Sequence, residues 1–394
     1  MKKLFIVAGL LLGGYLANAQ TTPTFDVSQL SVPQSSAFKL VDVSPTLIET
    51  PSTPKAFTLG VLQNIENSQG WPQNYSAEFT PYWWVLPANR NVYNFTGLKK
   101  QHNDITNADE WKENAFSSFK FASVSMAFVN KDMVPDTFTT TQKVFSAGVR
   151  TTLIKIHRAG YAKKLGNAID AWHNTALAEI GDDMNDSIYR SAARTGNVQL
   201  EASRSKELAG MRDSLKAAKK MTADALAAQV QSTLDEKPIF AWDFAGAYAM
   251  YGIGDTTWKT GRLGVWTTVS LNLPLGIGDS TKNYFSIAGY ARYMYDGYTL
   301  DNGVVTSSNA IDVGGKLSLQ FDRLNIGAEG VYRNYSTGPS LQSQRLVGFI
   351  NYRIGDNLYL NGTFGKDFGV EKAKLLTLFG IAWGFGNEQA SLPQ

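Results

Sequence analysis

The fold is decided by residues 311–333, which read IDVGGKLSLQFDRLNIGAEGVYR. From Ile311 to Phe321 apolar and polar residues alternate, and after Asp322 and Arg323 the alternation resumes at Leu324. Successive side chains of a strand point to opposite faces, so each half predicts a strand with one apolar and one polar face. The two-residue link between the halves predicts a β-hairpin.

The register of this hairpin predicts two charge pairs. Antiparallel pairing outward from the turn places Lys316 opposite Glu329. The same register places Asp312 opposite Arg333. Opposite charges directly across two strands stabilise a sheet, so the double match favours this register. A surface hairpin of a soluble sheet could show the same pairs.

Alternating segments of this kind recur through the chain. Eight follow Pro238, and four candidates precede residue 159, namely Ala56–Ile65, Asn74–Val85, Phe119–Val129 and Thr141–Ile156. Each has roughly the 9–11 residues with which a tilted strand crosses an outer membrane, and aromatic residues gather at their ends. Lipid-facing residues interleaved with lumen-facing ones also explain the low mean hydropathy of −0.19. The pattern predicts about twelve strands.

The start of the chain predicts an export signal. A cationic start (MKK), an apolar run from Leu4 to Leu12 and the tripeptide Ala-Asn-Ala before Gln20 are the three parts of a secretory signal peptide. The apolar run is shorter than the roughly 20 residues of a membrane-spanning helix. We therefore expect a mature protein that begins at Gln20.

With this signal, these strands and an aromatic-rich last strand, Leu375 to Phe385, the chain resembles Gram-negative outer-membrane β-barrel proteins in general. The resemblance covers most of residues 56–158 and 238–386 and carries no subfamily signature. It implies an all-β transmembrane antiparallel β-barrel in the outer membrane, surrounded by outer-membrane lipid. The chain departs from many such proteins by continuing past Phe385. The alternative is a soluble, secreted β-sandwich, which also alternates.

Composition and strand parity divide the chain into six parts. We expect a signal peptide (1–19), an extended periplasmic leader rich in Pro, Ser and Thr (20–55), barrel strands 1–4 (56–158), a periplasmic α-helical hairpin insert (159–237), barrel strands 5–12 (238–386) and a C-terminal tail (387–394). Both ends of such a barrel lie in the periplasm, which fixes the side of every link. Residues 88–115 become another periplasmic connection, with Trp111 as an anchor at the membrane interface.

The insert carries two apolar stripes at helical spacing. The first contains Leu165, Ile169 and Trp172, and the second contains Leu208, Met211 and Leu215. One interpretation is that the stripes pack on each other. The other is that they bind a periplasmic or outer-membrane protein partner. A plug made from the insert is disfavoured, since lumens of this strand number leave little room.

The polar faces of the strands predict charged residues inside the barrel. These lumen-facing residues are Glu78, Arg150, Asp243, Arg292, Asp312, Lys316, Glu329 and Arg333. Both signs occur, and two pairs match in register. We therefore expect the charges to cross-link the barrel wall and to leave a narrow or filled lumen.

Several classes of function are disfavoured by composition. The chain has no cysteine, which excludes thiolate chemistry, and its net charge of +3 makes nucleic acid a poor partner. Its three histidines form no metal-ligand spacing, and neither HExxH nor GxSxG occurs, so we expect no catalytic residue, no metal and no cofactor. We expect a non-enzymatic accessory or structural barrel whose periplasmic helices bind another envelope component. The alternative is a narrow channel for small solutes.

Overall fold

The computed structural model describes eighteen stretches of the chain. They are residues 24–26, 35–48, 57–63, 74–81, 92–104, 108–117, 122–133, 142–172, 194–200, 202–207, 223–253, 257–276, 282–301, 304–337, 342–355, 358–369, 375–384 and 389–391. The expected signal peptide and the Gln20 cleavage site lie outside the described residues.

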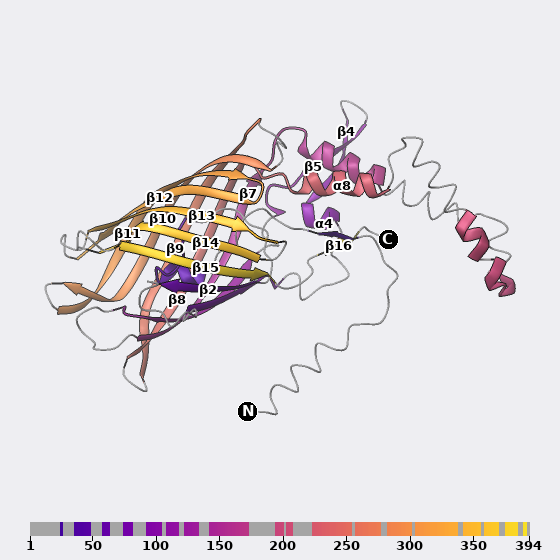
Figure 1. Cartoon of the computed structure of the whole chain (residues 1–394). Helices are drawn as coiled ribbons and strands as arrows, with labels where there is room; N and C mark the ends of the chain where they lie inside the picture. Colours follow the sequence, from indigo (N-terminus) through magenta and orange to yellow (C-terminus); the bar gives the residue numbers. More distant parts are fainter. Residues whose placement is uncertain are drawn as a thin grey trace.

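Twelve antiparallel strands close into one barrel (Figure 1), which confirms the expected fold class. They follow one another in chain order: β2 (Phe57–Gln63), β3 (Asn74–Phe79), β6 (Ser123–Lys131), β7 (Gln142–Ile156), β8 (Phe240–Ile253), β9 (Thr257–Pro274), β10 (Asn283–Asp301), β11 (Val304–Phe321), β12 (Leu324–Tyr335), β13 (Ser343–Arg353), β14 (Leu358–Lys366) and β15 (Leu375–Gly384), with β15 pairing back to β2.

The hairpin of β11 and β12 has the predicted register. Lys316 lies opposite Glu329, and Asp312 lies opposite Arg333. Asp322 adopts φ 42° in the tight link, a left-handed conformation that aspartate tolerates better than most residues. The alternation read from the sequence therefore fixed both the pairing and the face of each residue.

The outer face of the barrel is apolar. For example, Ile311, Val313 and Leu317 of β11 are exposed on it. A continuous apolar surface of this kind is unfavourable in water. Exposed aromatic side chains lie near both rims, for example Trp383 at the end of β15 and Trp258 at the start of β9. An apolar band between two aromatic belts is the surface of a barrel that spans a lipid bilayer.

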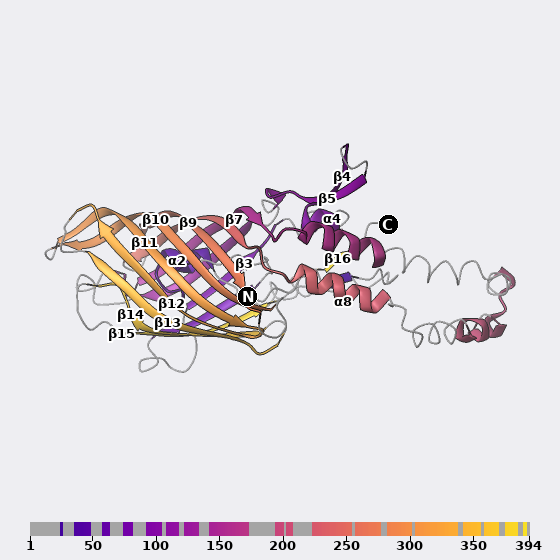
Figure 2. The ribbon, with the colours of Figure 1, turned by 90° about the horizontal axis from the view of Figure 1, so that it is seen from above.

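Residues 35–48 of the leader do not have the extended periplasmic course that the sequence predicted. Residues 35–48 are all buried, and they include a short helix, α2 (Ser36–Leu40), that lies inside the barrel (Figure 2). We call residues 35–48 the plug. Its Pro, Ser and Thr content suggested disorder because composition cannot show that polar groups on the barrel wall will satisfy this backbone.

A second folded unit, which we call the end module, lies at one rim of the barrel (Figures 1 and 2). It combines α4 (Val92–Thr96), the hairpin of β4 (Leu98–Asn103) and β5 (Ala108–Glu113), a helix over residues 161–172, and α8 (Ala223–Leu234). A two-stranded sheet of β1 (Thr24–Asp26) and β16 (Gln389–Ser391) contacts it through α8 and α4. The predicted C-terminal tail thus contains a short strand.

The end module uses part of the predicted partner-binding stripe for its own core. Leu165, Ile169 and Trp172 are buried, and they pack with Leu226 and Val230 of α8. The first stripe is therefore not exposed for a partner, and among the described residues it packs on α8. The second stripe, with Leu208, Met211 and Leu215, lies outside the described residues.

Trp111 also differs from its expected role at the membrane interface. Its ring stacks on Tyr93 with a centroid separation of 5.2 Å, and the Lys100 ammonium lies 4.8 Å from the ring centroid. Gly166 leaves room for the ring, because a Cβ at that position would lie 2.3 Å from Trp111. Trp111 therefore joins β5 to the helix of residues 161–172. Within the described ranges, no helix is both long and apolar enough to cross a membrane.

Candidate functional site

The plug ends its helix in a left-handed residue. The Val43 N–H donates to the Phe38 carbonyl oxygen at 3.1 Å, and the Asp42 N–H donates to the Lys39 carbonyl oxygen at 3.2 Å. These two bonds form a Schellman motif, whose left-handed position is usually glycine. Asp42 occupies it with φ 54°. A carboxylate at a conformationally costly position points to a role for that side chain.

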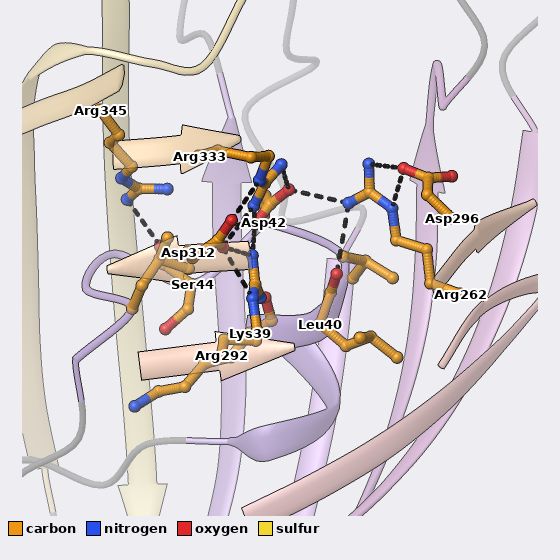
Figure 3. Close-up of polar contacts among 12 residues, drawn as sticks. Lys39, Leu40, Asp42, Ser44, Arg262, Arg292, Asp296, Asp312, Arg333 and Arg345 are labelled. Atoms are coloured by element: carbon orange, nitrogen blue, oxygen red, sulfur yellow. Dashed lines mark hydrogen bonds and ion pairs between the residues drawn. The ribbon is translucent and has the colours of Figure 1, made fainter. Parts of the chain in front are cut away.

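Three arginines of the barrel wall hold the Asp42 carboxylate (Figure 3). Arg292 Nη2 and Arg333 Nη2 donate to Oδ1 at 3.1 and 3.0 Å. Arg262 Nη1 and Arg333 Nη1 donate to Oδ2 at 2.8 and 2.9 Å. Both carboxylate oxygens are thus shared between two guanidinium groups. We call Arg262, Arg292 and Arg333 the arginine clamp.

Strand register positions the clamp. Arg292 of β10, Asp312 of β11 and Arg333 of β12 are direct cross-strand partners, so their side chains enter the lumen side by side. Asp312 accepts hydrogen bonds from Arg292 Nε at 2.8 Å and Arg333 Nε at 2.9 Å. Arg262 is held in the same way by Asp296, at 2.9 Å from its Nε. The wall carboxylates therefore orient the guanidinium groups before any contact with the plug.

The part of the plug that follows Asp42 is held through hydrogen bonds from the barrel wall to its backbone groups. The Glu329 carboxylate accepts the N–H groups of Leu47 and Ile48 at 2.8 and 2.9 Å. Lys316 Nζ donates to the Ile48 carbonyl oxygen at 3.2 Å. Glu329 and Lys316, predicted to pair across the wall, thus hold the leader between them. Their contacts satisfy buried backbone groups that have no helix or sheet partner.

The other end of the plug is bound by small hydroxyl side chains. Ser35 Oγ hydrogen-bonds to Ser76 Oγ on β3, and the Ala37 N–H donates to Ser125 Oγ on β6 at 3.0 Å. Gly148 of β7 allows this close approach, since a Cβ there would lie 2.9 Å from the Ala37 nitrogen. The plug is therefore fitted to the wall along its whole length.

All eight predicted lumen-facing charges are buried in the structure: Glu78, Arg150, Asp243, Arg292, Asp312, Lys316, Glu329 and Arg333. Glu78 and Arg150 form a separate ion pair of 2.8 Å. Asp243 accepts a hydrogen bond from Thr152 at 2.6 Å. Five of the eight, Arg292, Asp312, Lys316, Glu329 and Arg333, lie around the plug.

Four charged residues of this site were not among the predicted lumen-facing residues: Asp42, Arg262, Asp296 and Arg345. Arg345 donates to the carbonyl oxygens of Ser44 and Pro45, each at 3.0 Å. The alternation of β9, β10 and β13 carried the signal for the three wall residues, because each lies on the polar face of its strand. Asp42 gave no periodic signal, since it lies in a turn of the leader.

The junction between the barrel and the end module contains a partly buried lysine. The Lys237 N–H donates to the Tyr284 hydroxyl at 3.0 Å, and the Lys237 ammonium donates to Gln320 Oε1. Burial, together with the positive charge of Lys316, lowers the pKa of Lys237 to about 8. The charge of this ammonium is thus sensitive to mildly alkaline pH.

The described residues contain no group of three or more His, Asp or Glu side chains arranged to hold a metal ion. His102 and His157 each contact a single carboxylate, Asp109 and Glu113 respectively, and His173 lies outside the described residues. The chemistry that the lumen does offer is recognition. It binds one carboxylate through the arginine clamp and an extended backbone through Glu329, Lys316 and Arg345.

The closed strand order, the apolar outer band and the polar lumen now decide the architecture. The chain has the fold of an outer-membrane β-barrel. No family model and no curated protein matches it. Among solved structures, it is similar to the NanC porin, with 8% identity and a TM-score of 0.34 over 84% of this chain and 99% of that chain.

Two further solved barrels are similar to it. The transport unit of the autotransporter AIDA-I from Escherichia coli has 8% identity and a TM-score of 0.34, over 90% of this chain and 99% of that chain. A mutant of the Rh. blastica porin has 9% identity and a TM-score of 0.20, over 84% and 99%. TM-scores this low indicate no closer relationship, and nothing about the function of this barrel follows from them.

Proposed function

We propose that this chain is a non-catalytic outer-membrane barrel, closed by its own plug, that anchors a partner-binding end module in the periplasm. The observation that carries the proposal is the filling of the lumen by residues 35–48, all of which are buried. A barrel whose lumen holds its own chain is not an open pore in this state. The end module has a separate apolar core, so it can present a surface independently of the lumen.

The rim at which the end module lies supports the proposal that the module is on the periplasmic side of the membrane. It lies at the rim where β8 begins and β9 ends. The first barrel strand begins and the last one ends at the same rim, since Phe57 of β2 lies opposite Gly384 of β15. In an outer-membrane barrel with an even number of strands, both ends of the strand series lie in the periplasm. The expected signal peptide agrees with export to this compartment.

Exposed apolar residues in the insert support contact with a protein. Val198 and Leu200, in the helical stretch around residues 198–207, are 73% and 42% exposed. Figure 2 shows this helix beyond α8, on the side away from the barrel. Apolar side chains exposed to water are the kind of surface that a protein partner covers.

The test is to remove the outer part of the insert and keep the core of the end module. Replacing residues 173–222 by a short Gly-Ser linker should leave a heat-modifiable barrel and abolish co-purification of any envelope protein. The double substitution Val198→Ser and Leu200→Ser should weaken the same co-purification, whereas Lys206→Ser on the same helix should not. Equal recovery of every envelope protein with all four chains would contradict the proposal.

A narrow channel remains the second candidate, and one observation favours it. The plug is held by ionic and hydrogen-bonding contacts to a polar wall, and that wall would remain compatible with water if the plug withdrew. In a planar bilayer, the intact barrel should be silent under the anchor proposal. Transient current steps, lost when the plug is cross-linked to the wall, would favour the channel.

A further inference from the structure

We infer that Arg262, Arg292 and Arg333 form a carboxylate-binding site in the lumen, which the chain's own Asp42 occupies. When the plug withdraws, this site takes a carboxylate-bearing solute or peptide from solution. The inference deepens the channel candidate and rests on it, because the site can be reached only when the plug is out.

Without the plug, the site has one more positive charge than negative charge. Among the described residues, the wall supplies three guanidinium groups and two carboxylates in contact with them, Asp296 and Asp312. Asp42 supplies the third carboxylate, with oxygen–nitrogen distances of 2.8 to 3.1 Å. The emptied site therefore carries one excess positive charge, which attracts an anion from solution.

The geometry selects a carboxylate among anions. Arg333 presents two nitrogens, Nη1 and Nη2, to the two oxygens of Asp42 at 2.9 and 3.0 Å. This parallel, bidentate arrangement matches the planar fork of a carboxylate and gives no such match to chloride. Phe368 keeps the fork in place, since its ring centroid lies 3.8 Å from the Arg333 guanidinium carbon.

The wall beside the clamp adds selectivity for a peptide. Arg345 donates to the carbonyl oxygens that follow Asp42 in the chain, and Glu329 accepts two backbone N–H groups further on. A small carboxylate solute would use the clamp alone. A peptide with an acidic residue followed by an extended stretch would use both parts, as the plug does.

The experiment uses the full chain with residues 35–48 replaced by a Gly-Ser segment of equal length, which frees the lumen. In a planar bilayer with a KCl gradient, this variant should conduct. Glutarate should block the current at concentrations at least tenfold lower than its neutral analogue glutaramide. A synthetic peptide of residues 35–48 should block at lower concentrations still, and the same peptide carrying Asp42→Asn should lose at least tenfold in potency.

Substitutions in the wall give matched controls. In the plug-replaced chain, Arg292→Gln or Arg262→Gln should remove the difference between glutarate and glutaramide. Arg150→Gln removes another buried lumen arginine, which pairs with Glu78 instead, and should leave the difference unchanged. Two clamp variants guard against misfolding of one. Equal block by glutarate and glutaramide in a conducting barrel would overturn the site and leave the channel standing.

A barrel that never conducts would instead count against the channel, so binding is also measured without current. Glutarate, but not glutaramide, should raise the thermal midpoint of the plug-replaced barrel in detergent, and Arg292→Gln should abolish that shift. A midpoint that glutarate does not move, in a correctly folded barrel, would overturn the carboxylate site whatever the current shows.

Discussion

The plug and the end module fill space in opposite ways. The plug is held by the arginine clamp and by backbone hydrogen bonds from a polar wall. The end module is held by an apolar core that includes Leu165, Ile169 and Trp172. Apolar burial is non-directional and tolerates small shifts, whereas ionic contacts depend on single atoms. We therefore expect loss of apolar volume to unfold the module, and loss of one charge to loosen the plug.

The largest effect should come from the core of the end module. Trp172→Ala removes a side chain that is only 2% exposed, and such truncations cost about 3–5 kcal/mol. Limited proteolysis should then cut the end module while the barrel keeps its heat-modifiable shift. Val198→Ala, at an exposed position, is the control and should change nothing. A module that stays protease-resistant without Trp172 would refute its apolar core.

The next effect should appear in the plug. Glu329→Gln weakens two charge-assisted hydrogen bonds to Leu47 and Ile48, each worth about 1.5–3 kcal/mol. In this cysteine-free chain, Ser44→Cys supplies a reporter inside the plug, and its maleimide labelling should quicken by tenfold or more. Asn334→Ala, on the outward face of the same strand, should leave the rate unchanged. Identical rates in all three chains would argue against an ionic hold on the plug.

A smaller effect should test the contact between β5 and the helix of residues 161–172. On helix propensity alone, Gly166→Ala should stabilise the helix by about 1 kcal/mol. The Cβ of the new alanine, however, would lie 2.3 Å from the Trp111 ring. We expect the clash to win and the protease resistance of the end module to fall. Asn167→Ala, at the exposed neighbouring position, should raise resistance slightly. Stabilisation by Gly166→Ala would mean that the ring moves aside freely.

The smallest effect should be a pH dependence at the junction. Burial depresses the pKa of Lys237 to about 8, below the ordinary 10.5, so between these values the unfolded chain binds a proton that the folded chain does not. Stability should therefore rise with pH across this window. Thermal midpoints in detergent between pH 7.5 and 9.5 measure the slope, and Lys237→Met should reduce it. An unchanged slope in that variant would assign the dependence to other groups.

The barrel could be predicted well from the sequence, because apolar and polar residues alternate where one face of a strand meets lipid and the other meets the polar lumen. The register from Lys316 to Glu329 and the burial of Arg292 followed from this alternation alone. The plug was missed, since its contacts join residues such as Asp42 and Arg333 across 291 positions and leave no local period. The end module was predicted in part. The stripe with Ile169 was recognised, but its partner α8 was not.

The occupied lumen is the central claim, and one cross-link tests it most directly. The Ser35 and Ser76 hydroxyls are in contact, so Ser35→Cys with Ser76→Cys places two sulfurs within bonding reach in a chain that has no other cysteine. Mild oxidation of the folded barrel should form this disulfide quantitatively, as read by mass spectrometry of the linked peptides. Ser35→Cys with Ser286→Cys, across the lumen, should form none. A folded barrel in which the first pair stays reduced and labels freely would contradict the claim.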